Sequence, residues 1–132
     1  MARLGIAEAF AKYGATLRNA QWSVSAWAPD GALVLSLWEH HFQRGPEGTM
    51  DFHDSMARWS GPGNAEFRRN IAQAHAAKSP LRLIISKADD PGYIQSGADA
   101  SKTRKEFFVR DDLIGEVAAL DGDDFVVRFR RR

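Results

Sequence analysis

Two runs of alternating side chains, separated by a short turn sequence, constrain the fold of this chain most strongly. The first run extends from Gln21 to Ala28, and the second extends from Leu33 to Trp38. Alternation with a period of two residues is typical of β-strands, because successive side chains of a strand point to opposite faces. Pro29-Asp30-Gly31 lies between the runs, where Pro favours the first turn position and Gly accepts a positive φ. The sequence therefore predicts a β-hairpin.

Helical spacing elsewhere predicts two helices, and shorter apolar runs predict further strands. One helix is expected over Ala2–Tyr13, with Gly14 as its stop. The other is expected over residues 64–78, with Asn64 as the N-cap and Pro80 beyond its end. The expected strands are Leu81–Ser86, a short extended segment at Glu106–Val109, and a hairpin of Leu113–Leu120 and Phe125–Arg130. Residues 39–63 and 87–101 contain several Gly and Pro residues and are expected to be irregular.

The order helix, hairpin, helix, strand, hairpin is not the strict β–α alternation of a doubly wound parallel sheet. We therefore expect residues 1–132 to form a single α+β domain. It should contain two helices and a mostly antiparallel sheet of five or six strands, either open or barrel-like. The expected core positions are Val24, Leu33, Leu35, Phe67, Ile71, Leu83, Ile85, Val117, Val127 and Phe129.

Composition excludes several classes of protein. With 44% hydrophobic and 27% charged residues, the chain is neither a disordered tail nor a coiled coil. It has no Cys, which excludes disulfides, thiolate nucleophiles and cysteine-ligated metal sites. No apolar run is long enough for a membrane helix, and the first residues do not read as a secretory signal. We therefore expect a cytoplasmic protein that has no membrane partner.

A cluster of polar residues that could bind a metal or act in catalysis follows the first hairpin. It consists of Glu39, His40, His41, Asp51, His53 and Asp54. Imidazole and carboxylate groups suit zinc, manganese or iron, but the spacing matches no familiar ligand pattern. The order His41, Asn64, His75 is only a poor match to an HNH-type nuclease, and no P-loop, nucleophile elbow or H-E-x-x-H motif is present. We therefore expect no catalytic residue, metal or cofactor, and a metal-dependent hydrolase using residues 39–54 stays as an alternative.

Aromatic and basic residues favour a nucleic-acid partner. Trp38 has the opposite parity to the leucines of its strand, which predicts that it lies on the less apolar face. We expect Trp27 on the same face, where two indoles could stack on bases. Basic residues near a glycine-framed helix start and in the C-terminal segment could contact phosphates. The predicted nucleic-acid-binding residues are Trp27, Trp38, Arg68, Arg69, Lys102, Arg104, Lys105 and Arg110.

Three runs of the sequence carry a resemblance to known proteins: RNAQWSVSAWAPDGALVLSLW from Arg18, RWSGPGNAEFRRNIAQA from Arg58 and KEFFVRDDLIGEVAALDGDDFVVRF from Lys105. They are similar to bacterial proteins associated with restriction-type genes. The general layout of those proteins resembles the small PUA-like barrels, which include the EVE and SRA readers of modified bases. The resemblance covers residues 16–130 in layout and implies nucleic-acid binding, but no catalytic activity and no individual site residue.

The sequence as a whole therefore predicts a non-catalytic nucleic-acid-binding domain. A net charge of only +1 is low for a protein that relies on phosphate contacts alone, which favours a pocket that reads a modified base or an unusual structure. Three alternatives stay open: a protein-interaction or homo-oligomerisation module, a metal-dependent hydrolase, and a small-ligand binder. Exposed indoles would serve the first and the last of these.

Overall fold

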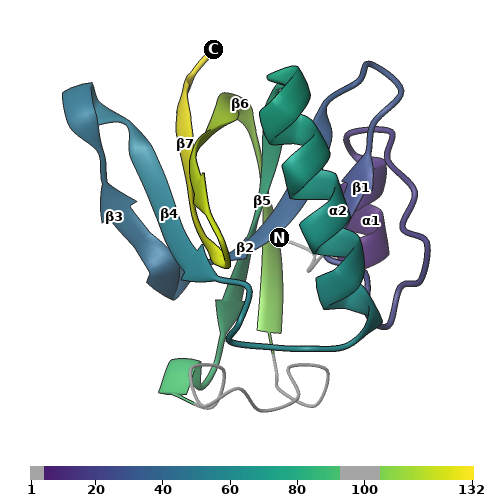
Figure 1. Cartoon of the computed structure of the whole chain (residues 1–132). Coiled ribbons are helices and arrows are strands. Elements are labelled where there is room, and N and C mark those ends of the chain that lie inside the picture. The colour runs from purple at the N-terminus through teal and green to yellow at the C-terminus, as the bar shows by residue number, and fades with distance from the viewer. Residues whose placement is uncertain (1–4, 93–104) are drawn as a thin grey trace.

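The computed structural model describes residues 5–92 and 105–132, which form one mixed sheet with helices on both of its faces (Figure 1). The described helices are α1 (Ile6–Ala11) and α2 (Pro62–Ala77), with short 3-10 turns η1 (Glu39–His41) and η2 (Pro46–Gly48). The described strands are β1 (Ser25–Trp27), β2 (Leu33–Trp38), β3 (Phe42–Arg44), β4 (Met50–Ser55), β5 (Leu81–Ala88), β6 (Lys105–Asp121) and β7 (Asp124–Arg131).

The seven described strands lie in the order β1-β2-β5-β6-β7-β4-β3. β2 and β5 are parallel, and every other neighbouring pair is antiparallel. The prediction of a mostly antiparallel α+β fold is therefore confirmed. The sheet is open, with β1 and β3 as its two edges, so the barrel-like alternative is wrong. The predicted number of five or six strands is also too low.

The predicted first hairpin is confirmed by β1 and β2. Trp27 pairs with Leu33 across the turn, and Gly31 has a φ of 91°. The backbone amide of Ala32 donates to the carboxylate of Asp30 at 3.0 Å, which closes the turn locally. Turn chemistry and alternation therefore agree with the observed pairing.

The prediction that residues 39–63 are irregular is wrong, because this segment contains the β3–β4 hairpin. Gly and Pro lie in its turn, where the amide of Gly45 donates to the carbonyl oxygen of Thr49. β4 is held mainly by its pairing with β7, a contact between residues 69 to 79 positions apart in the chain. Gly and Pro residues within a segment indicate turns, but they do not indicate whether a distant segment pairs with it.

β6 is one strand of 17 residues where the sequence predicted two segments. Its first part pairs with β5, and its last part pairs with β7. The register shifts between Leu81 and Leu83, opposite the stretch of β6 that separates the two predicted segments. Gly115 follows the shift, and a Cβ there would overlap the ring of Phe129. The irregularity allows one strand to pair with both neighbours in turn.

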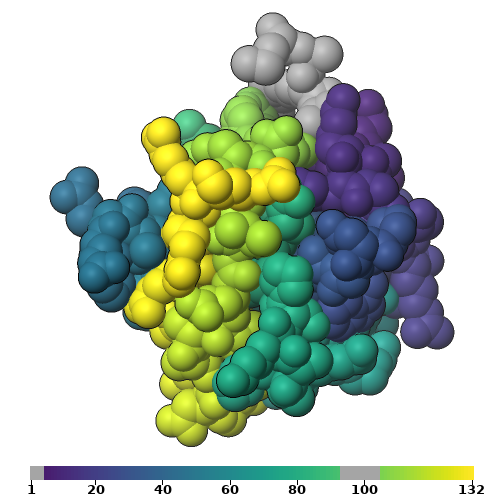
Figure 2. All heavy atoms as spheres, turned by 90° about the horizontal axis from the view of Figure 1, so that it is seen from above, coloured from purple at the N-terminus to yellow at the C-terminus, as the bar shows by residue number. Residues whose placement is uncertain are grey.

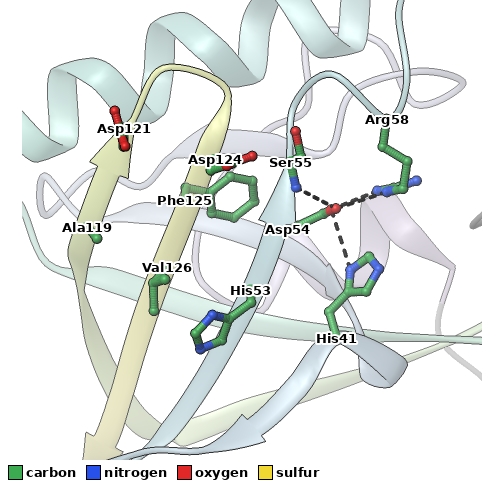
Figure 3. Close-up of a pocket in the computed structure, with 10 residues that line it drawn as sticks. All are labelled: His41, His53, Asp54, Ser55, Arg58, Ala119, Asp121, Asp124, Phe125 and Val126. Carbon is green, nitrogen blue, oxygen red and sulfur yellow. Dashed lines mark hydrogen bonds and ion pairs between the residues drawn. The ribbon is translucent and has the colours of Figure 1, made fainter.

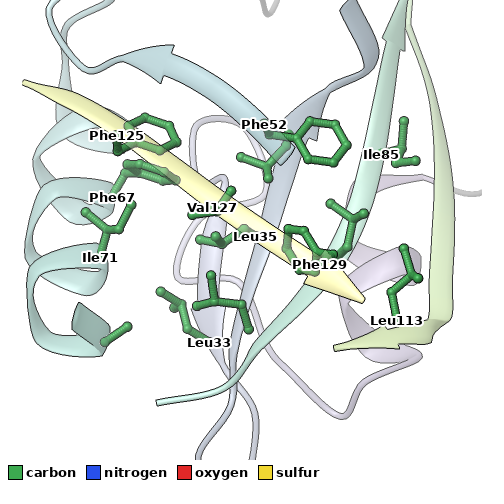
Figure 4. Close-up of a cluster of buried hydrophobic side chains, with 14 of the residues drawn as sticks. Leu33, Leu35, Phe52, Phe67, Ile71, Ile85, Leu113, Phe125, Val127 and Phe129 are labelled. Atoms are coloured by element: carbon green, nitrogen blue, oxygen red, sulfur yellow. The ribbon is translucent and has the colours of Figure 1, made fainter. Parts of the chain in front are cut away.

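The main core lies between α2 and one face of the sheet (Figure 4). Phe67, Ile71 and Ala74 of α2 are buried against apolar side chains from β2, β4, β5 and β7. Of the ten predicted core residues, eight are buried, and Val24 and Val117 are half-buried against the same cluster. α2 begins two residues before its predicted start. Its early turn comes close to the chain at Trp22, since a Cβ on Gly63 would overlap the Trp22 carbonyl oxygen.

α1 covers the opposite face of β1, β2, β5 and the first part of β6, where Phe10 packs against Val34 and Ile84. Tyr13 follows this helix and donates its hydroxyl hydrogen to the carbonyl oxygen of Leu83 at 2.8 Å. Burial raises the pKa of Tyr13 to about 12. Neither described helix has the length and apolar character needed to cross a membrane.

Candidate functional site

A pocket of the described chain lies where β4 ends and where β6 turns into β7 (Figure 3). It is open to solvent and has a volume of about 580 Å³. It is lined by His41, His53, Asp54, Ser55, Arg58, Ala119, Asp121, Asp124, Phe125 and Val126. The lining therefore combines two imidazole rings and a phenyl ring with three carboxylates and one guanidinium group.

Asp54 is the most constrained polar group of the pocket. Arg58 donates to its carboxylate twice, at 2.9 and 2.7 Å, and the backbone amide of Ser55 donates to it at 2.8 Å. Nδ1 of His41 lies 3.4 Å from the same carboxylate. The side chains of Asp54, His41 and Arg58 are only 10%, 9% and 13% exposed. A bidentate ion pair this well buried fixes the orientation of the carboxylate and of the imidazole beside it.

His53 leaves β4 on the opposite side from Asp54, because neighbouring residues of a strand point to opposite faces (Figure 3). It shares a face with Asp51, whose carboxylate accepts two hydrogen bonds from Arg128 at 2.9 Å. The polar cluster considered at residues 39–54 is therefore split between two faces of the sheet. Among the described residues, no three His, Asp or Glu side chains are grouped as a metal would need.

The β6–β7 turn adds two carboxylates to the mouth of the pocket. Asp121 and Asp124 are paired directly across this turn, and both are exposed. Like charges in directly opposite positions destabilise a hairpin. Between them, Asp123 forms an ion pair with Arg68 of α2, with 2.6 Å between Oδ1 and Nη1. The mouth is therefore rich in hydrogen-bond acceptors.

The two predicted stacking indoles do not form one surface. Trp27 pairs with Leu33, so it faces α2, and its Nε1 donates to the side-chain oxygen of Asn70 at 3.1 Å. Trp38 lies on the opposite face, where its ring stacks on His40 with the ring centroids 5.9 Å apart. Placing both on one face was wrong, because Leu33 follows the turn on the same side as Trp27. Neither indole lines the pocket.

The predicted basic residues are also separated. Arg68 lies near the pocket, where it contacts Asn64, Asp123 and the carbonyl oxygen of Met56. Arg69 is exposed on α2, and Lys105 is half-buried at the start of β6.

Arg110 lies at the β6 irregularity and donates two hydrogen bonds to Asp112 at 3.0 Å. The hydrogen bond from Arg110 holds the pKa of Asp112 below its ordinary value. Lys102 and Arg104 lie outside the described residues. Of the described members of the predicted set, Arg68 is the one that contacts the β6–β7 turn beside the pocket, through Asp123.

The sequence reasoning missed most of the pocket. Asp54 and Arg58 are four residues apart, but they lie at and beyond a strand end that was taken for a loop. Asp121 and Asp124 flank a recognised turn, yet nothing local indicates that this turn lies beside β4. Comparisons with protein-family models, curated proteins and solved structures find no match.

Proposed function

We propose that this protein binds nucleic acid and that its pocket receives a single base. The observation that carries the proposal is the combination of the His53 ring with the exposed carboxylates of Asp121 and Asp124 in one open pocket of about 580 Å³. This volume falls within the range of ordinary small-ligand sites and easily holds a nucleobase. The ring of His53 suits stacking, as aromatic side chains do in binders of unpaired bases.

The acceptors of the pocket define the edge of the base that fits best. Asp54 is already bound by Arg58 and the Ser55 amide, so the acceptors open to a ligand are the exposed carboxylates of Asp121 and Asp124. When they are ionised, these carboxylates can only accept hydrogen bonds. They therefore match a base that presents an amino group, as adenine, cytosine and guanine do. A base modified next to its amino group presents the same donor. In its more specific form, the proposal is therefore that the pocket reads a modified base. Phosphates are repelled by these carboxylates, so the nucleic-acid backbone must lie outside the mouth.

Fluorescence anisotropy with short labelled oligonucleotides tests the proposal. The set contains single strands of each base, a duplex, and strands with modified cytosine. Replacing His53 with Ala should weaken binding by about 1–3 kcal/mol, the usual contribution of one stacked base. His75→Ala is the matched control, because His75 is exposed near the end of α2 and does not line the pocket. No binding to any oligonucleotide at low salt, or equal losses in both variants, contradicts the proposal.

A second candidate function is hydrolysis of the bound strand. It is favoured by one observation, the contact between His41 and Asp54, because a carboxylate beside an imidazole nitrogen is how many enzymes orient a catalytic His. Prolonged incubation of an end-labelled strand with the protein distinguishes the candidates. Cleavage that disappears in His41→Gln supports hydrolysis, and an intact strand with normal binding supports a non-catalytic role.

A further inference from the structure

The face of β7 that borders the pocket continues into two arginines. Val126, Arg128 and Arg130 alternate along this face, while Phe125, Val127 and Phe129 point into the core. Val126 lines the pocket, and Arg128 and Arg130 line a second, smaller cavity of about 280 Å³. Pro46, Glu47 and Thr49 of the β3–β4 turn complete that cavity. The two cavities are therefore neighbours along one strand.

Arg128 is held in place by a buried partner. Its Nε and Nη2 donate to the two carboxylate oxygens of Asp51, whose side chain is 5% exposed. Nη1 is outside this bidentate contact, and the Arg128 side chain is 29% exposed toward the cavity side of the strand. The ion pair therefore fixes the guanidinium plane and leaves part of its donor set for a ligand.

Arg130 is more exposed and less firmly held. Its Nη2 lies 2.7 Å from Oε1 of Glu116, and the two side chains are 57% and 58% exposed. An ion pair in such surroundings contributes little stability, since solvent screens it. Arg130 can therefore exchange Glu116 for an anion of the ligand at little cost.

The surface around these arginines is accessible. In the view from above, the end of β7 lies beside the β3–β4 segment, with β6 on its other side (Figure 2). α1 packs on the part of this sheet face formed by β1, β2, β5 and the first part of β6, so neither described helix covers the part formed by β4 and β7. A step of two residues along a strand is about 6.6 Å, which resembles the length of one nucleotide in an extended chain.

We propose that Arg128 and Arg130 form a phosphate site for the nucleic-acid backbone next to the base held in the pocket. This inference rests on the proposed function and adds the path of the bound nucleic acid. Its backbone runs along β7, away from the β6–β7 turn. The ligand group is a phosphodiester. Glu47 lines the same cavity and opposes an anion there, so removal of its charge should strengthen binding.

The test is the salt dependence of oligonucleotide affinity in the full chain. Affinity falls with salt, so a plot of log affinity against log salt has a negative slope. Arg130→Gln should make this slope shallower by about 0.7, the value for one lost phosphate contact on a single strand. The loss of affinity should be the same whichever base the oligonucleotide carries, because a phosphate contact does not depend on the base. Arg44→Gln is the matched control, because Arg44 is an exposed arginine that pairs with Met50 on the core side of the neighbouring hairpin. Its slope should equal that of the unchanged protein.

Two more variants make the test specific to this cavity. Arg128→Lys keeps the charge but removes the planar fork, so it should weaken binding without unfolding the β4–β7 pair. Glu47→Asn should raise affinity at low salt, and Asn tolerates the left-handed conformation of Glu47, whose φ is 55°.

The two proposals fail in different ways. If Arg130→Gln and Arg44→Gln have equal slopes while His53→Ala weakens binding, the phosphate site is wrong and the base pocket stands. If the unchanged protein binds no oligonucleotide, both proposals are wrong.

Discussion

Replacing Asp54 with Ala tests whether the pocket wall is a fixed, buried ion pair. The substitution removes two hydrogen bonds from Arg58, at 2.9 and 2.7 Å, and leaves a guanidinium group that is only 13% exposed. Removing one partner of a buried pair typically costs about 3–5 kcal/mol, because the other charge is left without compensation. We expect a loss near the lower end of that range, since both side chains retain some contact with solvent.

The assay is urea unfolding followed by tryptophan fluorescence, arranged as a double-mutant cycle. Arg58→Met alone should also destabilise the protein, and the double variant should lose clearly less than the sum of the single losses. Glu116→Ala provides a reference, because it breaks the exposed pair with Arg130 and should cost less than about 1 kcal/mol. If Asp54→Ala costs no more than Glu116→Ala, the pair does not fix the pocket and the argument for an oriented carboxylate is refuted.

Three further predictions concern the core, a tyrosine and metal content. Ile71→Ala should cost about 2–5 kcal/mol in urea unfolding, since Ile71 of α2 is fully buried against the sheet. A loss below about half a kcal/mol would show that the helix register is wrong. Burial raises the pKa of Tyr13 from 10.0 to about 12, so the folded state favours the neutral phenol. The stability that this pKa shift contributes is therefore complete below pH 10 and is lost as the pH rises toward 12. Tyr13→Phe should remove this fall in the free energy of unfolding. If the fall is unchanged in Tyr13→Phe, Tyr13 is not its cause. Elemental analysis of untagged protein should find no stoichiometric zinc or manganese, and one equivalent that disappears in His53→Ala would revive the metal-dependent hydrolase.

Local patterns in the sequence were sufficient for the elements whose signals are local. The hairpin around Gly31 combines alternation with turn residues, and α2 combines an apolar stripe with Pro80 beyond its end. Both were predicted nearly as they are observed. The apolar faces of these elements also identified most of the core, because a residue that repeats on one face of a helix or strand has one surface to bury.

The site depends on long-range pairing, which the sequence pattern does not contain. β4 carries polar residues on both faces, so it lacks clean alternation, and its partner β7 lies at the other end of the chain. The pairing of β4 with β7 brings His53 beside Val126 and Asp51 beside Arg128. The predicted face of Trp27 was wrong for a similar reason. It depends on the register of the hairpin, in which Trp27 pairs with Leu33. Site geometry was therefore much harder to predict than fold class.

The measurement that tests the central claim most directly is an amide chemical-shift titration with a short single-stranded oligonucleotide. A base in the pocket and a backbone along β7 predict that the largest shifts lie at residues 53–55 and 124–130, and that His53→Ala reduces the shifts around the pocket. Residues of α1 and β1, on the far part of the sheet, should not move. Large shifts confined to α1 and β1, or no shifts at saturating oligonucleotide, would contradict the claim that this protein holds nucleic acid at the β4–β7 pocket.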